Sequence, residues 1–171
     1  MDIKVSVIIP TLNEEKGISR VLAEIPRSCV QEVIIVDSST DNTLSIAKEL
    51  GVKVVREPKR GYGRALQTGI RLSEGDITVY LDGDCTYDPK EISKLIEPII
   101  QKDFDIVLGS RFKGKILPGS MDLLHKFGNI VISLIFNVLF FKRVSDTQTG
   151  FRAIKKSWLG CQSSDAYGME Y

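Results

Sequence analysis

The sequence predicts an α/β fold in which helices cover a mostly parallel, doubly wound sheet. Short β-branched, apolar runs alternate along the chain with segments whose apolar residues recur at helical spacing. Short connections join these segments, as expected for successive β–α–β units. The chain has 171 residues, enough for one compact core, so we predict a single domain over residues 1–171.

Five strands are predicted in order along the chain. The first is almost wholly apolar, which is typical of a strand that is buried on both faces, and the second and fourth are also expected to be buried. The five predicted strands are 5–9, 32–37, 52–55, 77–81 and 106–108.

Helices are predicted in the intervals between these strands. The first two begin in stretches rich in capping residues, at 10–15 and at 38–43. The third follows a glycine-broken loop at 59–63 and ends at Leu72, and the fourth covers residues 89–101.

Acidic residues, basic residues and glycines follow the carboxyl ends of the predicted strands. In a doubly wound sheet these ends meet at one edge, and ligands bind in the crevice beyond it. The segments concerned are 11–15, Asp37, 59–63, 82–84 and 109–111. We therefore predict a ligand site at that edge.

Asp82 and Asp84 follow the fourth strand and are separated only by Gly83. Two carboxylates at this spacing can face one Mg²⁺ or Mn²⁺ ion, since both ions prefer oxygen ligands. Such an ion would neutralise charge on a departing diphosphate. Asp-Gly-Asp is also favoured in ordinary turns, and its place beside the other polar segments favours the metal site.

Charge and cysteine content limit the classes of partner. The net charge of +1 offers no global attraction for nucleic acid, so we expect no nucleic-acid partner. Cys29, Cys85 and Cys161 are widely spaced and form no CxxC pair, which is typical of a reducing compartment. The first apolar run is too short for a signal peptide, and we expect a cytoplasmic protein.

Six segments carry a recognisable combination of motifs. They are 7–14 (VIIPTLNE), 36–43 (VDSSTDNT), 60–66 (RGYGRAL), 81–84 (LDGD), 109–111 (GSR) and 145–152 (SDTQTGFR). Together they resemble the family 2 glycosyltransferases, and within them the branch that glycosylates dolichyl or polyprenyl phosphate. The resemblance implies a Rossmann-like, three-layer GT-A fold, with a nucleotide-sugar-binding part at about 1–112 and an acceptor- and membrane-facing part at about 113–171.

The resemblance also implies which residues bind the donor. The nucleotide sugar would contact Pro10, Thr11, Asn13, Glu14, Asp37, Arg60, Gly61, Gly63 and Asp82. The Mg²⁺ or Mn²⁺ ion would be held by Asp82, Asp84 and Thr86, the last standing where some relatives have a glutamine. Ser38 stands where the family commonly has a second acid.

Structural roles are the alternative for several of these donor residues. Pro10 and Asn13 would then only shape a turn, Asp37 would cap the following helix, and Arg60 would be a solvated surface charge.

A polyprenyl phosphate acceptor is already an anion at neutral pH and needs cations rather than a general base. The resemblance places its phosphate on Arg111 and His125, with Asn129 as a polar partner and Arg152 as a further cation. Asp146 would position acceptor or sugar and would complete the catalytic set with Asp82 and Asp84. Alternatively, His125 is a surface residue, and Asp146 is a turn cap with Arg152 as its salt-bridge partner.

Residues 127–141 are almost wholly apolar. In a helix, His125, Asn129, Ser133 and Asn137 recur at steps of four and form one polar stripe. The 15 residues extend over about 22 Å, less than the roughly 30 Å of a hydrocarbon core. We expect an amphipathic interfacial helix that docks peripherally on the cytoplasmic face of a membrane, does not span it, and guides the lipid phosphate along the stripe. A core helix or a dimer contact is the alternative.

The expected activity is that of an inverting, metal-dependent hexosyltransferase that moves a hexose from GDP-mannose or UDP-glucose to a polyprenyl or dolichyl phosphate. Two alternatives are transfer to a sugar or glycerate hydroxyl and an inactive nucleotide- or lipid-binding module. Residues 165–171 resemble the beginning of a segment that relatives continue with another helix and strand, so we expect a truncated C-terminal part.

Overall fold

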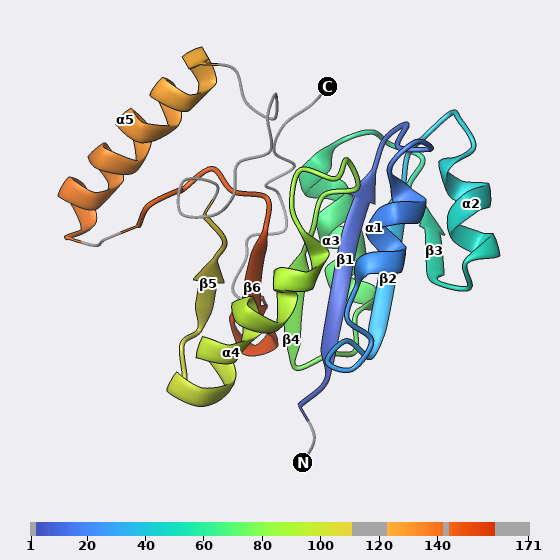
Figure 1. Cartoon of the computed structure of the whole chain (residues 1–171), viewed down its shortest axis with the longest axis horizontal. Coiled ribbons are helices and arrows are strands. Elements are labelled where there is room, and N and C mark those ends of the chain that lie inside the picture. Colours follow the sequence, from blue (N-terminus) through green and yellow to red (C-terminus); the bar gives the residue numbers. More distant parts are fainter. Residues whose placement is uncertain (1–2, 111–122, 142–143, 160–171) are drawn as a thin grey trace.

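A computed structural model describes residues 3–110, 123–141 and 144–159. Within these ranges six strands form one sheet, in the order β3-β2-β1-β4-β6-β5 (Figure 1). The strands are β1 Val5–Thr11, β2 Glu32–Asp37, β3 Lys53–Arg56, β4 Ile77–Tyr80, β5 Ile106–Leu108 and β6 Arg152–Lys155. The strands β3, β2, β1 and β4 pair in parallel, and the predicted mostly parallel α/β sheet is confirmed.

All but the last of the helices lie where the sequence pattern predicts them, and the last, at 156–159, was not predicted. The helices are α1 Ile18–Glu24, α2 Thr43–Glu49, α3 Tyr62–Leu72, α4 Ile92–Lys102, α5 Leu123–Phe140 and the short α6 Lys156–Leu159. A 3₁₀ turn, η1 Pro89–Glu91, leads into α4. The Asp88 carboxylate accepts a hydrogen bond of 2.9 Å from Lys90 N and so caps this turn.

Helices cover both faces of the sheet and create the three layers. Alternate residues of β1 point to opposite faces: Val7 and Ile9 pack with α1, α2 and α4, whereas Ile8 packs with α3 and α6. All three side chains are fully buried. This alternation places two apolar clusters on either side of the sheet, and it leaves the strand ends open to polar residues.

Strand β6 was not among the predicted strands. It runs antiparallel to both of its neighbours, with Ala153 opposite Val79 of β4 and Val107 of β5. Its position between β4 and β5 draws the preceding segment, 145–151, to the carboxyl end of β4. The SDTQTGFR motif and the LDGD motif are therefore neighbours in space.

Helix α5 lies at the β5 end of the molecule, away from β3 and α2 (Figure 1). Many of its apolar side chains face outward, and Leu134, Val138 and Leu139 are 61%, 65% and 66% exposed. The predicted helix over this segment is confirmed. No helix in the described ranges combines the length and apolar character needed to cross a bilayer.

Gly69 allows α3 to lie close against β1. A Cβ built at Gly69 would overlap the side chain of the fully buried Ile8. We expect Gly69→Ala to lower the free energy of unfolding by about 1–3 kcal/mol, because overpacking outweighs the higher helix propensity of alanine. Urea unfolding followed by circular dichroism measures this change. Gly128→Ala in α5, where an added Cβ meets no atom within 4 Å, is the matched control and is expected to cost nothing.

Candidate functional site

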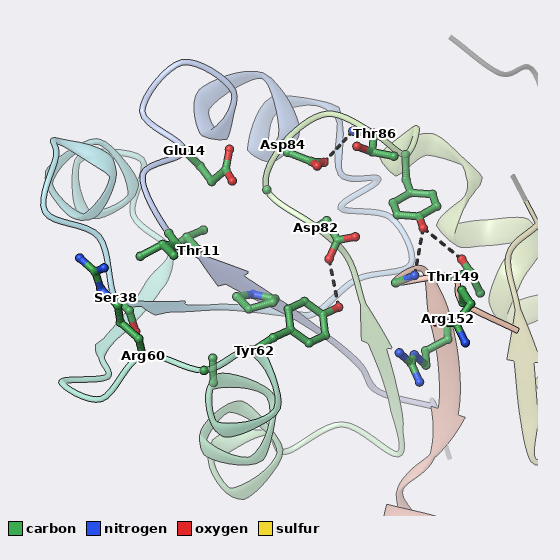
Figure 2. A pocket seen from close by; sticks show the side chains of 18 of the residues that line it. Thr11, Glu14, Ser38, Arg60, Tyr62, Asp82, Asp84, Thr86, Thr149 and Arg152 are labelled. Carbon is green, nitrogen blue, oxygen red and sulfur yellow. Dashed lines mark hydrogen bonds between the residues drawn. The ribbon is translucent and has the colours of Figure 1, made fainter. Parts of the chain in front are cut away.

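A cavity of about 600 Å³ lies at the carboxyl ends of β1 and β4, beside the start of β6 (Figure 2). It is formed by five segments that are far apart in the sequence. The lining residues are Pro10, Thr11, Leu12, Glu14, Ser38, Arg60, Gly61, Tyr62, Ala65, Asp82, Gly83, Asp84, Thr86, Tyr87, Thr147, Gln148, Thr149, Gly150 and Arg152. The cavity thus lies at the edge of the sheet where the sequence placed a ligand site.

Nine of the candidate residues lie in the part of the chain that the structure describes and line this cavity. They are Pro10, Thr11, Glu14, Arg60, Gly61, Asp82, Asp84, Thr86 and Arg152. Asn13, Asp37, Gly63, Asn129 and Asp146 are described but are not lining residues. Arg111 lies outside the described residues, and so does the side chain of His125.

Asp82 lies between the start of α3 and the segment that precedes β6. The hydroxyl of Tyr62 donates a hydrogen bond of 3.0 Å to Asp82 Oδ1. On the other side, Gly150 comes so near that a Cβ at this position would overlap Asp82 Oδ2. Burial and the Asp82 carboxylate raise the pKa of Tyr62 far above its ordinary value. The Tyr62 hydroxyl therefore keeps its proton and continues to orient Asp82.

Tyr87 holds Gly150 in this place. Its hydroxyl accepts a hydrogen bond of 2.9 Å from Gly150 N and one of 3.3 Å from the Thr149 hydroxyl. Its ring stacks on Phe151 with 5.4 Å between the ring centroids. Tyr87 follows β4 whereas the other three residues precede β6, so these contacts join the two motifs across the cavity wall.

Acidic side chains gather on the cavity floor. Asp84 Oδ1 accepts a hydrogen bond of 2.8 Å from Thr86 N, and Figure 2 shows Asp84 and Glu14 on the same side of the cavity. Burial raises the pKa of Glu14, and the charges of Asp84, Asp41 and Asp82 raise it further. The cavity therefore carries a local negative potential that would favour a bound cation.

This donor set fits a divalent ion that is shared with a substrate. Among the residues that the structure describes, no group of three His, Cys, Asp or Glu side chains could hold a metal ion. Asp82 and Asp84 both face the cavity, and their oxygens suit Mg²⁺ or Mn²⁺. An ion on these two carboxylates would complete its coordination with water and with oxygens of a bound ligand.

Asp37 lies beneath the cavity wall rather than in it. It is fully buried, and Oδ1 accepts hydrogen bonds from the Thr11 hydroxyl at 2.9 Å and from Ser39 N at 3.2 Å. Oδ2 forms an ion pair of 2.6 Å with Arg56. The N-cap residue of α2 is Asn42, and the first backbone N–H of the helix, that of Thr43, is accepted by Asp41 at 3.0 Å. Asp37 thus positions Thr11 and does not cap the helix.

Asn13 joins the loop after β1 to the loop after β2. Its φ angle of 61° lies in the left-handed region, which asparagine tolerates better than most residues. Its backbone N donates to Ser39 Oγ at 2.8 Å, and its side-chain Oδ1 accepts from Thr40 N at 2.9 Å. The turn holds Thr11 and Glu14 on either side of Asn13 at the cavity wall.

The glycine loop before α3 approaches the cavity through one of its two candidate glycines. Gly61 has a φ of 144° and precedes the helix, in a backbone region that favours glycine. Arg60 and Gly61 line the cavity, whereas Gly63 lies within α3.

The opposite wall is formed by the segment before β6. Arg152 begins that strand, and its guanidinium lies 5.6 Å from the centroid of the Tyr80 ring. The side chain lines the cavity, and its buried Nε makes no hydrogen bond within the described residues. Asp146 is buried, and its carboxylate accepts from Gln148 N at 3.1 Å. It thus shapes the turn that presents the next four residues to the cavity.

Several lining residues were not among the predicted site residues. Most lie inside the recognised motifs, and these are Leu12, Ser38, Tyr62, Ala65, Gly83, Thr147, Gln148, Thr149 and Gly150. Their position inside these motifs is the sequence feature that could have identified them as site residues. Tyr87 lies outside the motifs, and only the fold brings it to Gly150.

Comparison with known protein families settles the family. The model of glycosyl transferase family 2 matches residues 6–162. The chain belongs to this family.

Similar proteins of this family are known from archaea. The chain is 37% identical over 172 residues to the low-salt glycan biosynthesis hexosyltransferase Agl6 of Haloferax volcanii, and the match covers 97% of this chain but 42% of that protein. It is 34% identical over 157 residues to the dolichyl-phosphate hexose transferase of the same organism, covering 90% and 67%. A UDP-N-acetylglucosamine–dolichyl-phosphate N-acetylglucosaminyltransferase of Methanococcus voltae is 34% identical over 187 residues, covering 96% and 74%.

Solved structures confirm the GT-A fold. The glucosyl-3-phosphoglycerate synthase of Mycobacterium tuberculosis, solved with Mn²⁺, UDP-glucose and phosphoglyceric acid, matches with a TM-score of 0.74 and 26% identity. The match covers 92% of this chain and 58% of the synthase. The chain therefore spans about three fifths of the synthase and, as above, less than half of Agl6.

Proposed function

We propose that this chain contains the donor site of an inverting, metal-dependent hexosyltransferase that transfers a hexose from GDP-mannose or UDP-glucose to a polyprenyl or dolichyl phosphate. The observation that carries the proposal is the cavity in which Asp82 and Asp84 lie between a basic glycine loop and the Thr147–Arg152 wall. The names of two archaeal relatives, which include dolichyl phosphate, support the acceptor class.

The cavity offers separate places for the parts of a nucleotide sugar. In Figure 2, Ser38 and Arg60 lie at one end, Thr149 and Arg152 lie at the other, and Asp82 lies between them. The nucleoside would occupy the first end, against Pro10, Thr11 and Glu14, and the diphosphate would lie beside Asp82 and Asp84. The hexose would then extend toward Arg152. A cavity of about 600 Å³ is of the usual size for a small-molecule site.

Asp37 acts on the nucleoside through the residues it holds. Its contacts with Thr11 and Ser39 set the cavity wall at the nucleoside end, and Asn13 ties the same two loops together. Gly61 and Gly63 allow the basic loop and α3 to approach the nucleotide, and Arg60 neutralises phosphate charge.

The metal would be held by Asp82 and Asp84, with Thr86 acting through a water molecule. When bound, Mg²⁺ or Mn²⁺ supplies Lewis-acid stabilisation of the leaving diphosphate. Tyr62 and Gly150 fix the orientation of the Asp82 carboxylate on either side, so that the binding geometry is set before substrate arrives.

The acceptor phosphate attacks the anomeric carbon from the face opposite the diphosphate, which inverts the configuration. No proton has to be removed from this nucleophile. Arg152 offers a cationic group at the acceptor end of the cavity, and Arg111, His125 and Asn129 remain the proposed additional partners of the phosphate. Asp146 positions the acceptor wall through Gln148.

A panel of nucleotide sugars tests the donor assignment. GDP-mannose, UDP-glucose and UDP-N-acetylglucosamine are added with and without Mn²⁺, and the midpoint of thermal unfolding is measured. The donor is expected to raise the midpoint, by mass action on the folded state, and to raise it more with Mn²⁺. Transfer of labelled hexose to polyprenyl phosphate then tests catalysis. A donor that raises the midpoint but is never turned over would instead support a binding module.

Transfer to a hydroxyl is the second candidate, because one of the matching solved structures is a glucosyl-3-phosphoglycerate synthase. A hydroxyl acceptor requires a general base, and Asp146 is the acid proposed for this region. Asp146→Asn would then abolish transfer to phosphoglycerate. If phosphate is the nucleophile, the same substitution is expected to leave measurable transfer to polyprenyl phosphate.

Membrane docking is proposed for α5. Its apolar side chains from Val131 to Phe141 are largely exposed, and Lys142 and Arg143 follow in the sequence, as suits anionic headgroups. We expect the protein to float with vesicles of phosphatidylcholine and phosphatidylglycerol, and a variant carrying Leu134→Asp and Phe140→Asp to remain in the dense fraction. Equal flotation of the two proteins would contradict docking. A concentration-dependent dimer of the unmodified protein that the double substitution dissolves would assign α5 to a second copy.

A further inference from the structure

Two polar side chains of α5 are engaged by the segment that leads to the cavity. Asn137 Nδ2 donates to Val144 O at 2.8 Å, and Asn137 Oδ1 accepts from Val144 N at 2.7 Å. Ser133 Oγ accepts from Thr147 N at 3.1 Å and lies 3.1 Å from the Thr147 hydroxyl. Four hydrogen bonds therefore join one face of α5 to residues 144–147.

The expected role of the polar stripe changes accordingly. The sequence placed Ser133 and Asn137 along a path for the lipid phosphate. Ser133 is buried, at 4% exposure, and the amide of Asn137 pairs with both backbone groups of Val144. These two members of the stripe face the protein, and their polar atoms set the position of the chain after α5.

The segment that they hold continues directly into the cavity wall. Residues 147–150 line the cavity. Thr149 and Gly150 bond to the Tyr87 hydroxyl, and Gly150 abuts Asp82. A continuous series of contacts thus runs from α5 to the carboxylate at the centre of the cavity. A shift of α5 relative to the sheet would displace this wall.

The opposite side of α5 makes the contact with the membrane, if the proposed function holds. Its side chains are apolar and exposed, while the side toward the domain carries the four hydrogen bonds. One helix therefore carries both the proposed lipid contact and the attachment of the cavity wall. A bilayer that fixes the position of α5 can change the position of the cavity wall, because hydrogen bonds join α5 to the segment that leads into this wall.

We propose that Ser133 and Asn137 are positioning residues that couple the docking of α5 on a bilayer to the arrangement of the cavity wall at residues 147–150. The inference rests on the proposed transfer to a lipid phosphate, and it adds regulation of the same site. Docking sets the acceptor end of the cavity, so the enzyme transfers hexose efficiently only at a membrane surface.

The test uses a short-chain, water-soluble prenyl phosphate as acceptor, so that delivery of acceptor by the bilayer plays no part. Empty vesicles of phosphatidylcholine and phosphatidylglycerol are expected to lower the acceptor KM of the unmodified protein about tenfold, the size of a typical coupling between two sites. Asn137→Ala and Ser133→Ala are each expected to float with vesicles and to show the unmodified donor-induced rise in thermal midpoint. Their acceptor KM is expected to stay high with vesicles present.

Matched variants separate positioning from general damage. Ser133→Thr keeps the hydroxyl and is expected to retain the response to vesicles. Ser93→Ala is the control on another helix. Ser93 lies on α4, does not line the cavity, and donates its hydroxyl to the backbone carbonyl of Lys90. This variant is expected to respond to vesicles as the unmodified protein does.

Two results overturn the coupling while the proposed function stands. One is transfer to the soluble acceptor that empty vesicles leave unchanged. The other is a full vesicle response in both alanine variants. Failure of the unmodified protein to use any prenyl phosphate, soluble or in vesicles, would overturn the proposed function and this inference together.

Discussion

Replacing Asp82 or Asp84 by asparagine is expected to lower kcat/KM for hexose transfer by about 10³-fold, the scale of losing a principal electrostatic group at a reacting centre. Each change removes a negative charge from the cavity while preserving side-chain size. The two carboxylates would serve the same ion, so the double variant should lose little more than either single one. Steady-state transfer rates across a Mn²⁺ titration measure both effects, and chelation of the metal should reproduce the loss in the unmodified protein.

Asp76→Asn is the matched control for these substitutions. Asp76 directly precedes β4, at the opposite end of the strand from Asp82, is exposed, and accepts a hydrogen bond from Lys4 N, which asparagine can still accept. Transfer by this variant should be unchanged. The donor-induced rise in thermal midpoint should lose its dependence on Mn²⁺ only in the Asp82 and Asp84 variants. If changing both cavity aspartates to alanine left transfer at its normal rate and equally responsive to metal, the proposed mechanism would be wrong.

The parallel part of the sheet could be predicted because burial on both faces leaves a local signal. The strands β1, β2 and β4 are buried at every position except Pro10 and Glu32, and most of their residues are apolar, as double coverage by helices requires. Strand β6 lacks this signal. Only Ala153 and Ile154 are buried, and they lie between Arg152 and Lys155. Its place between β4 and β5 depends on long-range pairing, which no short window of sequence contains.

The edge that carries the site was predictable for the same reason, because the ends of parallel strands coincide. The sequence did not predict which residues at that edge line the cavity and which hold other residues in place. Asp37 ends β2 as expected, yet Arg56 and Thr11 occupy its oxygens. Tyr62 bonds to a residue 20 positions away, and Tyr87 to one 63 positions away. Spacing of four residues predicted the polar stripe of α5, but the partners of that stripe lie beyond the helix.

Gly150→Ala is expected to reduce kcat/KM by about 10²-fold, the effect of a displacement near 1 Å at a reacting centre. Gly150 does not have a positive φ, so alanine suits its backbone, and only space is lacking. A Cβ there overlaps Asp82 Oδ2. Either Asp82 must turn away from the Tyr62 hydroxyl, or the wall that carries Thr149 must retreat. Steady-state kinetics at saturating Mn²⁺, together with the thermal midpoint, measure the change.

A double-mutant cycle identifies which of these movements occurs. If Asp82 turns, Tyr62→Phe removes the bond that the added methyl group would break. The double variant should then be less impaired than the product of the two single effects. If the wall retreats, the two effects should multiply. Gly69→Ala supplies the control, because its Cβ also overlaps a neighbour, Ile8, but about two turns along α3 from Tyr62. Gly69→Ala should lower the free energy of unfolding. At temperatures below the thermal midpoint of the variant, its kcat/KM should be unchanged. Equal loss of activity in Gly69→Ala and Gly150→Ala would show that any packing defect disables the enzyme, and the specific role of Gly150 beside Asp82 would be refuted.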